Sequence, residues 1–185
     1  MPFDAPSETS PAATLFAAAD VVAILRERGR LGASHDVATA EALERWCTHA
    51  AELLAPHAAD HAALADLLAL VFAYDAPSLV REAPNQAVLA REGARDVIRE
   101  FANRLFDGGD LDSDRMKEII DGIKAALPYR GRELFYPIRL ALAGRAGDGD
   151  LDRVILLLDA AAKLDFAVPV KGARQRMLEF CAAFD

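Results

Sequence analysis

The amino-acid sequence predicts an all-α protein, and three observations support that prediction. Alanine, the residue with the highest helix propensity, fills 39 of the 185 positions. Apolar residues recur at helical spacing through almost the whole chain. No stretch of about four to eight residues alternates between apolar and polar side chains as a half-buried strand does. We therefore expect packed helices without a β-sheet.

Capping residues, glycines and prolines set the bounds of the first three expected helices. The first runs over 10–29, since a Ser-Pro pair begins it and a glycine ends it. The second is expected over 36–55 and stops before a proline. The third is expected over 60–74, because the sequence Asp-Ala-Pro then interrupts the apolar pattern.

The remaining helices follow from the same signals. A long helix is expected over 84–107, and Ser113 is the expected N-cap of the next one. Further helices are expected over 113–127, 133–143, 148–164 (starting at the first or second aspartate of that segment) and 171–184. A turn rich in glycine and aspartate at 107–112 divides the chain into two expected helical subdomains, 1–109 and 110–185.

The composition excludes several classes of protein. A hydrophobic content of 53% is too high for intrinsic disorder, and no apolar run reaches the ~18 residues of a membrane helix. The first residues lack the pattern of a signal peptide. Cys47 and Cys181 are too few for a disulfide framework, and Cys47 lies with Trp46 on an apolar helix face. We expect a cytoplasmic protein without a membrane partner.

The net charge of −8 is unevenly distributed. Residues 1–114 hold 9 Lys and Arg against 19 Asp and Glu, a net charge of −10. Residues 115–145 hold seven against three, a net charge of +4. Solvated helix faces are enough to explain this uneven charge distribution, but the basic segment also suits a localised anionic partner. The acidic N-terminal half suits a protein partner.

Groups of residues that suggest catalysis or metal binding fail on spacing. His57 and His61, with His49 and Asp60 nearby, lack the surrounding pattern of a zinc site. The acidic turn at 107–114 does not place a glycine or a bidentate glutamate where a calcium loop needs them. Nucleotide-binding and nucleophile motifs are absent from the sequence. We expect no metal, no cofactor and no catalytic residue in this chain.

An arginine within an apolar segment indicates a functional site. The segment FYPIRLALAGR at 135–145 places Arg139 on a short helix that ends at Gly144. Because an unpaired buried arginine is costly, Arg139 either pairs with an acid or faces an anionic partner. Together with the loop at 145–150 it would lie at the mouth of a helix N-terminus, which favours anions.

This segment, with Asp150-Leu151 and VILLL at 154–158, resembles the C-terminal anticodon-binding region of bacterial glutamyl-tRNA synthetases. The family pattern is P-[LI]-R-x-A-[LI]-[TS]-G, followed by a short loop and a helix. Residues 72–75 and 89–95 are similar to the helical subdomain that precedes it, so the resemblance covers roughly 40–180. Its departures are Asp148-Gly149 in place of a hydroxyl residue and proline, alanine at 143 in place of threonine, and aspartate at 159 in place of glycine.

The resemblance implies a helical cage for unstacked anticodon bases, as in class I glutamyl-tRNA synthetases. The residues that it places at the bases are Arg139, Asp148, Gly149 and Leu151. Nearby arginines are candidates for phosphate contacts: Arg130, Arg132 and Arg145. The implied partner is the anticodon arm of tRNA(Glu).

The signature motifs of the synthetase catalytic domain are absent, so this chain is not expected to aminoacylate tRNA alone. Two interpretations remain open. One is a tRNA-binding module, either a fragment of a synthetase or a stand-alone paralogue. The other is a stand-alone relative that has lost RNA binding and acts as a protein-interaction or regulatory domain.

Overall fold

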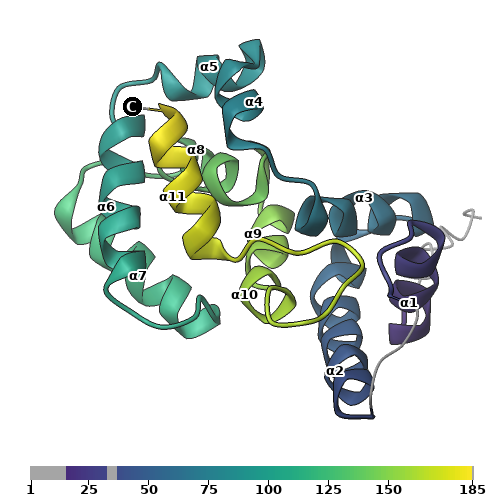
Figure 1. Ribbon diagram of the computed structural model, residues 1–185. Coiled ribbons are helices and arrows are strands. Elements are labelled where there is room, and N and C mark those ends of the chain that lie inside the picture. Colours follow the sequence, from purple (N-terminus) through teal and green to yellow (C-terminus); the bar gives the residue numbers. More distant parts are fainter. Residues whose placement is uncertain (1–15, 33–36, 185) are drawn as a thin grey trace, which may run out of the picture.

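The computed structural model describes residues 16–32 and 37–184, and its regular elements there are helices (Figure 1). An isolated antiparallel bridge joins Leu31 to Phe166. The expected all-α fold is confirmed. None of the helices in these ranges has the length and apolar character needed to cross a membrane. In chain order the elements are α1 (Ala18–Glu27), α2 (Val37–Leu54), the 3₁₀ helix η1 (Ala55–His57), α3 (His61–Phe72), α4 (Ala76–Arg81), α5 (Ala83–Leu89), α6 (Ala94–Phe106), α7 (Ser113–Ala126), α8 (Arg132–Ala143), α9 (Asp150–Ile155), α10 (Leu158–Ala161) and α11 (Ala173–Phe184).

Side-chain and glycine caps explain several helix ends. The Asp60 carboxylate accepts a hydrogen bond of 2.8 Å from an amide in the first turn of α3. Helix α8 ends at Gly144, whose φ of +76° is a left-handed conformation that glycine adopts without strain. The expectation that Ser113 caps α7 is wrong. Asp112 is the cap, since its carboxylate accepts a 2.8 Å hydrogen bond from the Arg115 amide.

Other helix boundaries differ from the expected ones. The expected start of the first helix, at 10–11, lies outside the described residues. The long helix over 84–107 is divided into α5 and α6 at Gly93, where φ is +85°. A Cβ atom on Gly93 would lie 2.1 Å from a ring carbon of Tyr129, so a helical side chain has no space there. Helix α4 was not expected, because Pro77 suggested a break. Pro77 lies in the first turn, where its missing N–H is not needed. The helix expected over 148–164 is divided into α9 and α10.

The buried side chains form two apolar clusters. The first cluster comes mainly from α1, α2 and α3, and includes Trp46 and Cys47 as expected. The second comes mainly from α4 to α8 and α11. Helix α9 lies between them (Figure 1) and serves both, since Leu151 belongs to the second cluster and Val154 to the first. Trp46 also donates a 3.2 Å hydrogen bond from Nε1 to the Leu157 carbonyl.

The turn at 107–112 connects segments that are distant in the sequence. The Asp159 carboxylate accepts hydrogen bonds of 2.7 Å from the amides of Leu111 and Ala173, so one side chain holds the turn and begins α11. Leu105 before the turn and Met116 after it belong to the same apolar cluster. The subdomain boundary between residues 109 and 110 stays a prediction.

A fully buried arginine, Arg176 of α11, joins the two clusters. Its guanidinium group donates to the carbonyls of Leu70 and Val71 at the end of α3, at 3.0 and 2.5 Å. It also donates to the Leu142 carbonyl at the end of α8 at 2.8 Å, and to the Lys171 carbonyl at 2.9 Å. Carbonyls in the last turn of a helix lack helical partners and carry the negative end of its dipole. A cation therefore suits this position.

The Tyr74 side chain covers this arginine. The Cζ atom of Arg176 lies 4.7 Å from the centre of the Tyr74 ring. The Tyr74 hydroxyl lies 2.5 Å from the Ala141 carbonyl oxygen and 3.0 Å from that of Arg176. Burial lowers the pKa of Arg176 to about 10, so the side chain is still charged at neutral pH.

We predict that Arg176→Met destabilises the fold strongly. The methionine fills similar space but leaves several buried carbonyls without a donor, at about 1–3 kcal/mol each. We expect a loss of about 3–5 kcal/mol in the free energy of unfolding, measured by urea denaturation. Gln175→Met, an exposed neighbour on the same helix, is the matched control. Equal losses in the two variants would contradict the role given to Arg176.

A second prediction concerns the Cys47 thiol. Burial raises the pKa of Cys47 to about 11, with a smaller contribution from Glu44. The reactive thiolate is therefore scarce in the folded protein at pH 8. With iodoacetamide and mass spectrometry, we expect the half-buried Cys181 to be modified first, and Cys47 only when urea unfolds the chain. The folded state retains this proton longer than the unfolded state, so Cys47 lowers stability as the pH rises from 9 to 11.

Candidate nucleic-acid interface

The candidate interface is the loop between α8 and α9. Helix α8 packs its apolar face into the second cluster, and Gly144 ends the helix. The loop then runs to Asp150, the first residue of α9. Gly147 lies close to the Leu151 side chain, because a Cβ atom on this glycine would be 3.1 Å from Leu151 Cδ1. The loop is therefore closely packed against the helix that it begins.

Arg139 holds the ends of this loop together. Its Nε and Nη2 atoms donate to the two carboxylate oxygens of Asp152, both at 2.7 Å. Its Nη1 atom donates to the Gly147 carbonyl, also at 2.7 Å. The Cζ atom lies 4.9 Å from the centre of the Phe135 ring. A bidentate pair of this kind fixes the arginine in position and orientation.

Of the two alternatives that the sequence left for Arg139, the structure shows a pair with an acid. The residue is only 8% exposed, and three of its five N–H groups already have acceptors. Its expected contact with RNA bases stays a prediction. We name the group formed by Arg139, Asp152 and the Gly147 carbonyl the loop clamp.

The loop faces an open hollow of about 510 Å³. Three of the expected base-contacting residues line it, and so does one expected phosphate contact, Arg145. The Leu151 side chain is 1% exposed, so it supports the loop from below. The lining residues are His57, Arg145, Gly147, Asp148, Gly149, Asp150 and Leu151.

His57 also lines the hollow, although in the sequence it stands out only as a candidate metal ligand. It ends the 3₁₀ helix η1 between α2 and α3, and the fold places it beside a loop about ninety positions later. No local signal indicates this neighbour, since only tertiary packing creates it. Among the described residues there is no group of three or more His, Cys, Asp or Glu side chains that could hold a metal ion.

The other two expected phosphate contacts do not line the hollow. Arg130 caps the end of α7, since its guanidinium group donates to the carbonyls of Lys124, Leu127 and Tyr129 at 2.6–2.7 Å. The Cζ atom of Arg132 lies 5.8 Å from the centre of the Tyr136 ring. Both residues are exposed, at the connection between α7 and α8.

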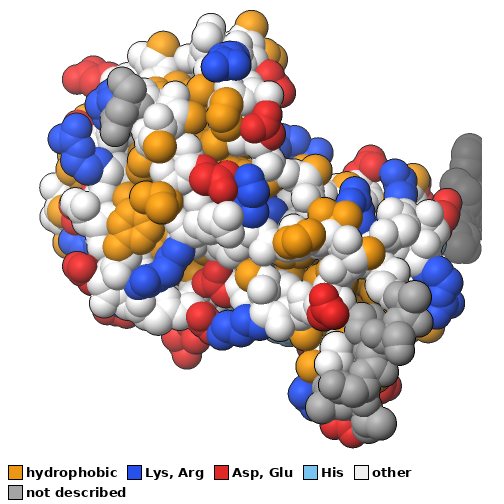
Figure 2. Space-filling view, viewed as in Figure 1, with side chains coloured by type: hydrophobic (Ala, Val, Ile, Leu, Met, Phe, Trp, Pro, Cys, Tyr) orange, Lys and Arg blue, Asp and Glu red, His pale blue; other side chains and the backbone are white. Residues whose placement is uncertain are grey.

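The charges around the hollow are mixed. Arg145 contributes a cation, Asp148 and Asp150 contribute carboxylates, and the loop clamp neutralises Asp152. Acidic and basic side chains are likewise interspersed over the face seen in Figure 2, with no continuous basic band. Such a surface disfavours contact along a whole phosphate backbone. It suits a small number of contacts to one or two nucleotides, in which carboxylates accept from base amines and cations meet phosphates.

The chain is similar to a known protein family over most of its length. The family model described as "Anticodon binding domain" matches residues 18–163. A glutamate–tRNA ligase of Heliobacterium modesticaldum is 33% identical over 73 residues, which are 40% of this chain and 15% of that protein. The ligase of Bacillus subtilis is 30% identical over 73 residues, again 40% and 15%. That of Geobacillus stearothermophilus is 34% identical over 71 residues, 38% and 14%.

The matched part of this chain spans only about 15% of the length of these ligases. No solved structure matches the chain significantly. The family match, in contrast, extends over most of the chain and includes α8, α9 and the loop between them. The resemblance to glutamyl-tRNA synthetases drawn from residues 135–158 is confirmed. The chain belongs to the anticodon-binding-domain family.

Proposed function

We propose that the chain is a tRNA-binding module that holds the anticodon arm at the loop between α8 and α9. The family match supports the class of function. Because the curated relatives are glutamate–tRNA ligases, tRNA(Glu) is the proposed tRNA, and the cytoplasm, where tRNA is charged, is the proposed location. The observation on which the proposal depends is the loop clamp, which presents the loop beside Arg145 and His57.

The proposed role is binding without aminoacylation by this chain alone. The segment matched to the ligases is a small part of their length. The family model that matches this chain describes a binding domain. In this proposal Arg145 contacts a phosphate beside the splayed base, and Asp148 accepts a hydrogen bond from an exocyclic amine. Gly149 lets the base approach the backbone closely.

Arg139 acts in this proposal as a positioning residue. Its exposure of 8% and its bidentate pair with Asp152 leave little of it available to RNA. The clamp instead fixes the Gly147 carbonyl, and with it the direction of the next three residues. Arg130 and Arg132 are proposed to contact phosphates farther along the arm, from the connection between α7 and α8.

A second candidate function is a protein-interaction or regulatory domain that has lost RNA binding. The observation that favours it is the pair of carboxylates at Asp148 and Asp150, which line the hollow and have no ion-pair partner in the part of the chain that the structure describes. Carboxylates repel phosphates, and the N-terminal half is acidic as well. Measurement of RNA binding separates the two candidates.

We predict that the protein binds a labelled tRNA(Glu) transcript, as measured by fluorescence anisotropy at 50 and 200 mM salt. Arg145→Gln should weaken binding about five-fold at low salt and lower the salt dependence, because one phosphate contact is lost. Arg153→Gln is the matched control, since Arg153 is an exposed arginine of α9 outside the hollow. Absence of binding at 50 mM salt would reject the proposal and favour the protein-interaction domain. Equal affinity for an unrelated tRNA would contradict base reading.

The role of the loop clamp is tested by comparing Asp152→Asn with Arg139→Met. If Arg139 positions the loop, both variants should weaken tRNA binding about ten-fold or more, since either change destroys the bidentate pair. Hydrogen exchange of the amides at 145–150 should accelerate in both. If Arg139 instead binds RNA directly, Asp152→Asn should preserve or strengthen binding, because it frees the guanidinium group. That result would contradict the positioning role.

A further inference from the structure

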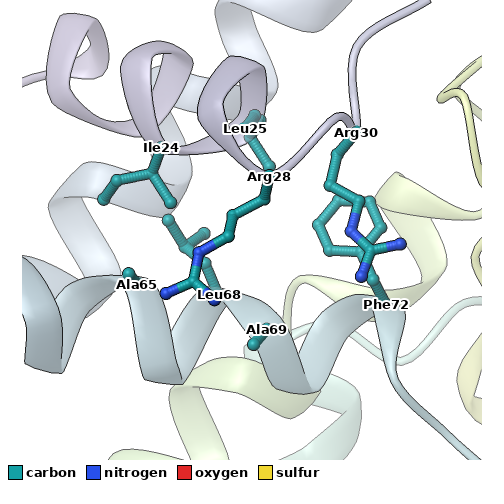
Figure 3. Close-up of a pocket in the computed structure, with 8 residues that line it drawn as sticks. All are labelled: Ile24, Leu25, Arg28, Arg30, Ala65, Leu68, Ala69 and Phe72. Carbon is teal, nitrogen blue, oxygen red and sulfur yellow. The ribbon is translucent and has the colours of Figure 1, made fainter.

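A second cavity lies between α1 and α3, at residues that are not part of the hollow (Figure 3). Its volume is about 40 Å³. The floor consists of aliphatic and aromatic side chains, among which Ile24, Leu25 and Leu68 are almost fully buried. Ala65 and Ala69, one turn apart on α3, leave the space open because their side chains end at Cβ.

Two arginines border this cavity. Figure 3 shows Arg28 extending from the end of α1 toward α3, and Arg30 lying over the Phe72 ring. The Cζ atom of Arg30 is 5.4 Å from the centre of that ring. The backbone of Arg30 is fixed, since its amide donates to the Leu25 carbonyl at 2.7 Å and its carbonyl accepts from the Ala167 amide at 2.8 Å.

The guanidinium groups of Arg28 and Arg30 have no carboxylate partner within residues 16–32 and 37–184. Other arginines in this part of the chain, such as Arg26 and Arg153, also have no acid partner, so what distinguishes Arg28 and Arg30 is their position beside the cavity. Within the described residues, two arginines beside one apolar cavity therefore have their donors available to a ligand. An arginine fork matches the geometry of a carboxylate, which it binds through two parallel hydrogen bonds.

The cavity lining also limits what the ligand can be. Apart from the arginines it offers no hydroxyl, amide or carboxylate side chain. Arginines can bind the acceptor edge of guanine, but this lining has no side-chain acceptor for the exocyclic amine of adenine, cytosine or guanine, so it matches a simple anion better than a base. A compact aliphatic group would instead be stabilised by the apolar surface that it buries here.

We propose that this cavity binds a carboxylate attached to a compact aliphatic group. The aliphatic group lies over Ala65 and Ala69, and the carboxylate lies between the guanidinium groups of Arg28 and Arg30. Such a ligand is either a free short-chain organic acid or the C-terminal aliphatic residue of a peptide. Both ligands carry the same carboxylate and aliphatic group, but the peptide also has a backbone that can contact the surrounding surface.

The test is a titration of the ¹⁵N-labelled full chain with 4-methylpentanoate, followed by amide chemical shifts. We expect saturable shifts confined to the segments 24–30 and 65–72. The neutral 4-methylpentanamide should bind about ten-fold more weakly or worse, because it lacks the charge that the arginines bind. Equal binding of acid and amide would overturn the proposal.

A second titration, with a peptide, distinguishes a free acid from a peptide C-terminus. Acetyl-Gly-Gly-Leu with a free carboxylate is compared with its C-terminal amide. Tighter binding than 4-methylpentanoate, lost on amidation, would assign the site to a peptide C-terminus. Weaker binding than 4-methylpentanoate would assign it to a free acid. Inorganic phosphate at the same concentration should give no comparable shifts, and equal shifts with phosphate would show a general anion surface and overturn the proposal.

Variants locate the site. Arg28→Gln and Arg30→Gln should each weaken 4-methylpentanoate binding about five-fold or more, since each removes one charged donor. Ala69→Leu should block the cavity, and its unperturbed amide spectrum would verify folding. Arg26→Gln is the matched control, because Arg26 is on the same helix but outside the cavity lining. A loss with Arg26→Gln as large as with Arg28→Gln would overturn the proposal. None of these results depends on tRNA binding.

Discussion

The charge of Arg176 has to be satisfied without a carboxylate, and the relative positions of the main helices depend on how this is done. Its donors reach the last turns of α3 and α8, so the carbonyl ends of two helices from different clusters converge on one side chain of a third. Removing a cation from water is costly, and carbonyls at helix ends offset part of that cost because they need donors themselves. The same contact anchors the last turn of α8, just before the loop at the candidate interface begins.

The loop itself uses a second buried arginine in a different way. Arg139 pairs with Asp152 through two hydrogen bonds, so its charge is neutralised locally. Arg176 connects the ends of α3 and α8, whereas Arg139 fixes the conformation of the loop between α8 and α9. For the proposed tRNA binding, the exposed charge near the loop matters more than the net charge of the chain. The structure also gives a role to the aspartate at 159, where the family resemblance expects glycine. Asp159 holds two distant amides, and the neighbouring Gly172 has no side chain to obstruct its carboxylate.

Much of the fold could be predicted because periodicity and caps are local properties. The inward faces containing Trp46 and Cys47, the start of α3 at Asp60 and the end of α8 at Gly144 are confirmed. Two failures are local, since Asp112 rather than Ser113 caps α7 and Pro77 lies in the first turn of α4, whereas another occurs where a distant residue decides the conformation. The ring of Tyr129 occupies the space beside Gly93 and so divides the helix expected over 84–107. At the interface, the sequence indicated the loop and Arg145, whereas His57 could not be linked to them because nothing in its own segment points to a neighbour so far along the chain.

The sequence by itself determined the helical class, most helix bounds and the segment at 135–158 in which the family resemblance lies. These depend on spacing, propensity and short motifs, which are read within a few turns of the chain. The tertiary structure alone decided that Arg139 pairs with Asp152, that His57 lines the same hollow, and that Arg28 and Arg30 border an apolar cavity. The physical reason is that hydrogen bonds and ion pairs are made by whichever groups packing brings within about 3 Å, and burial of the apolar clusters sets that packing.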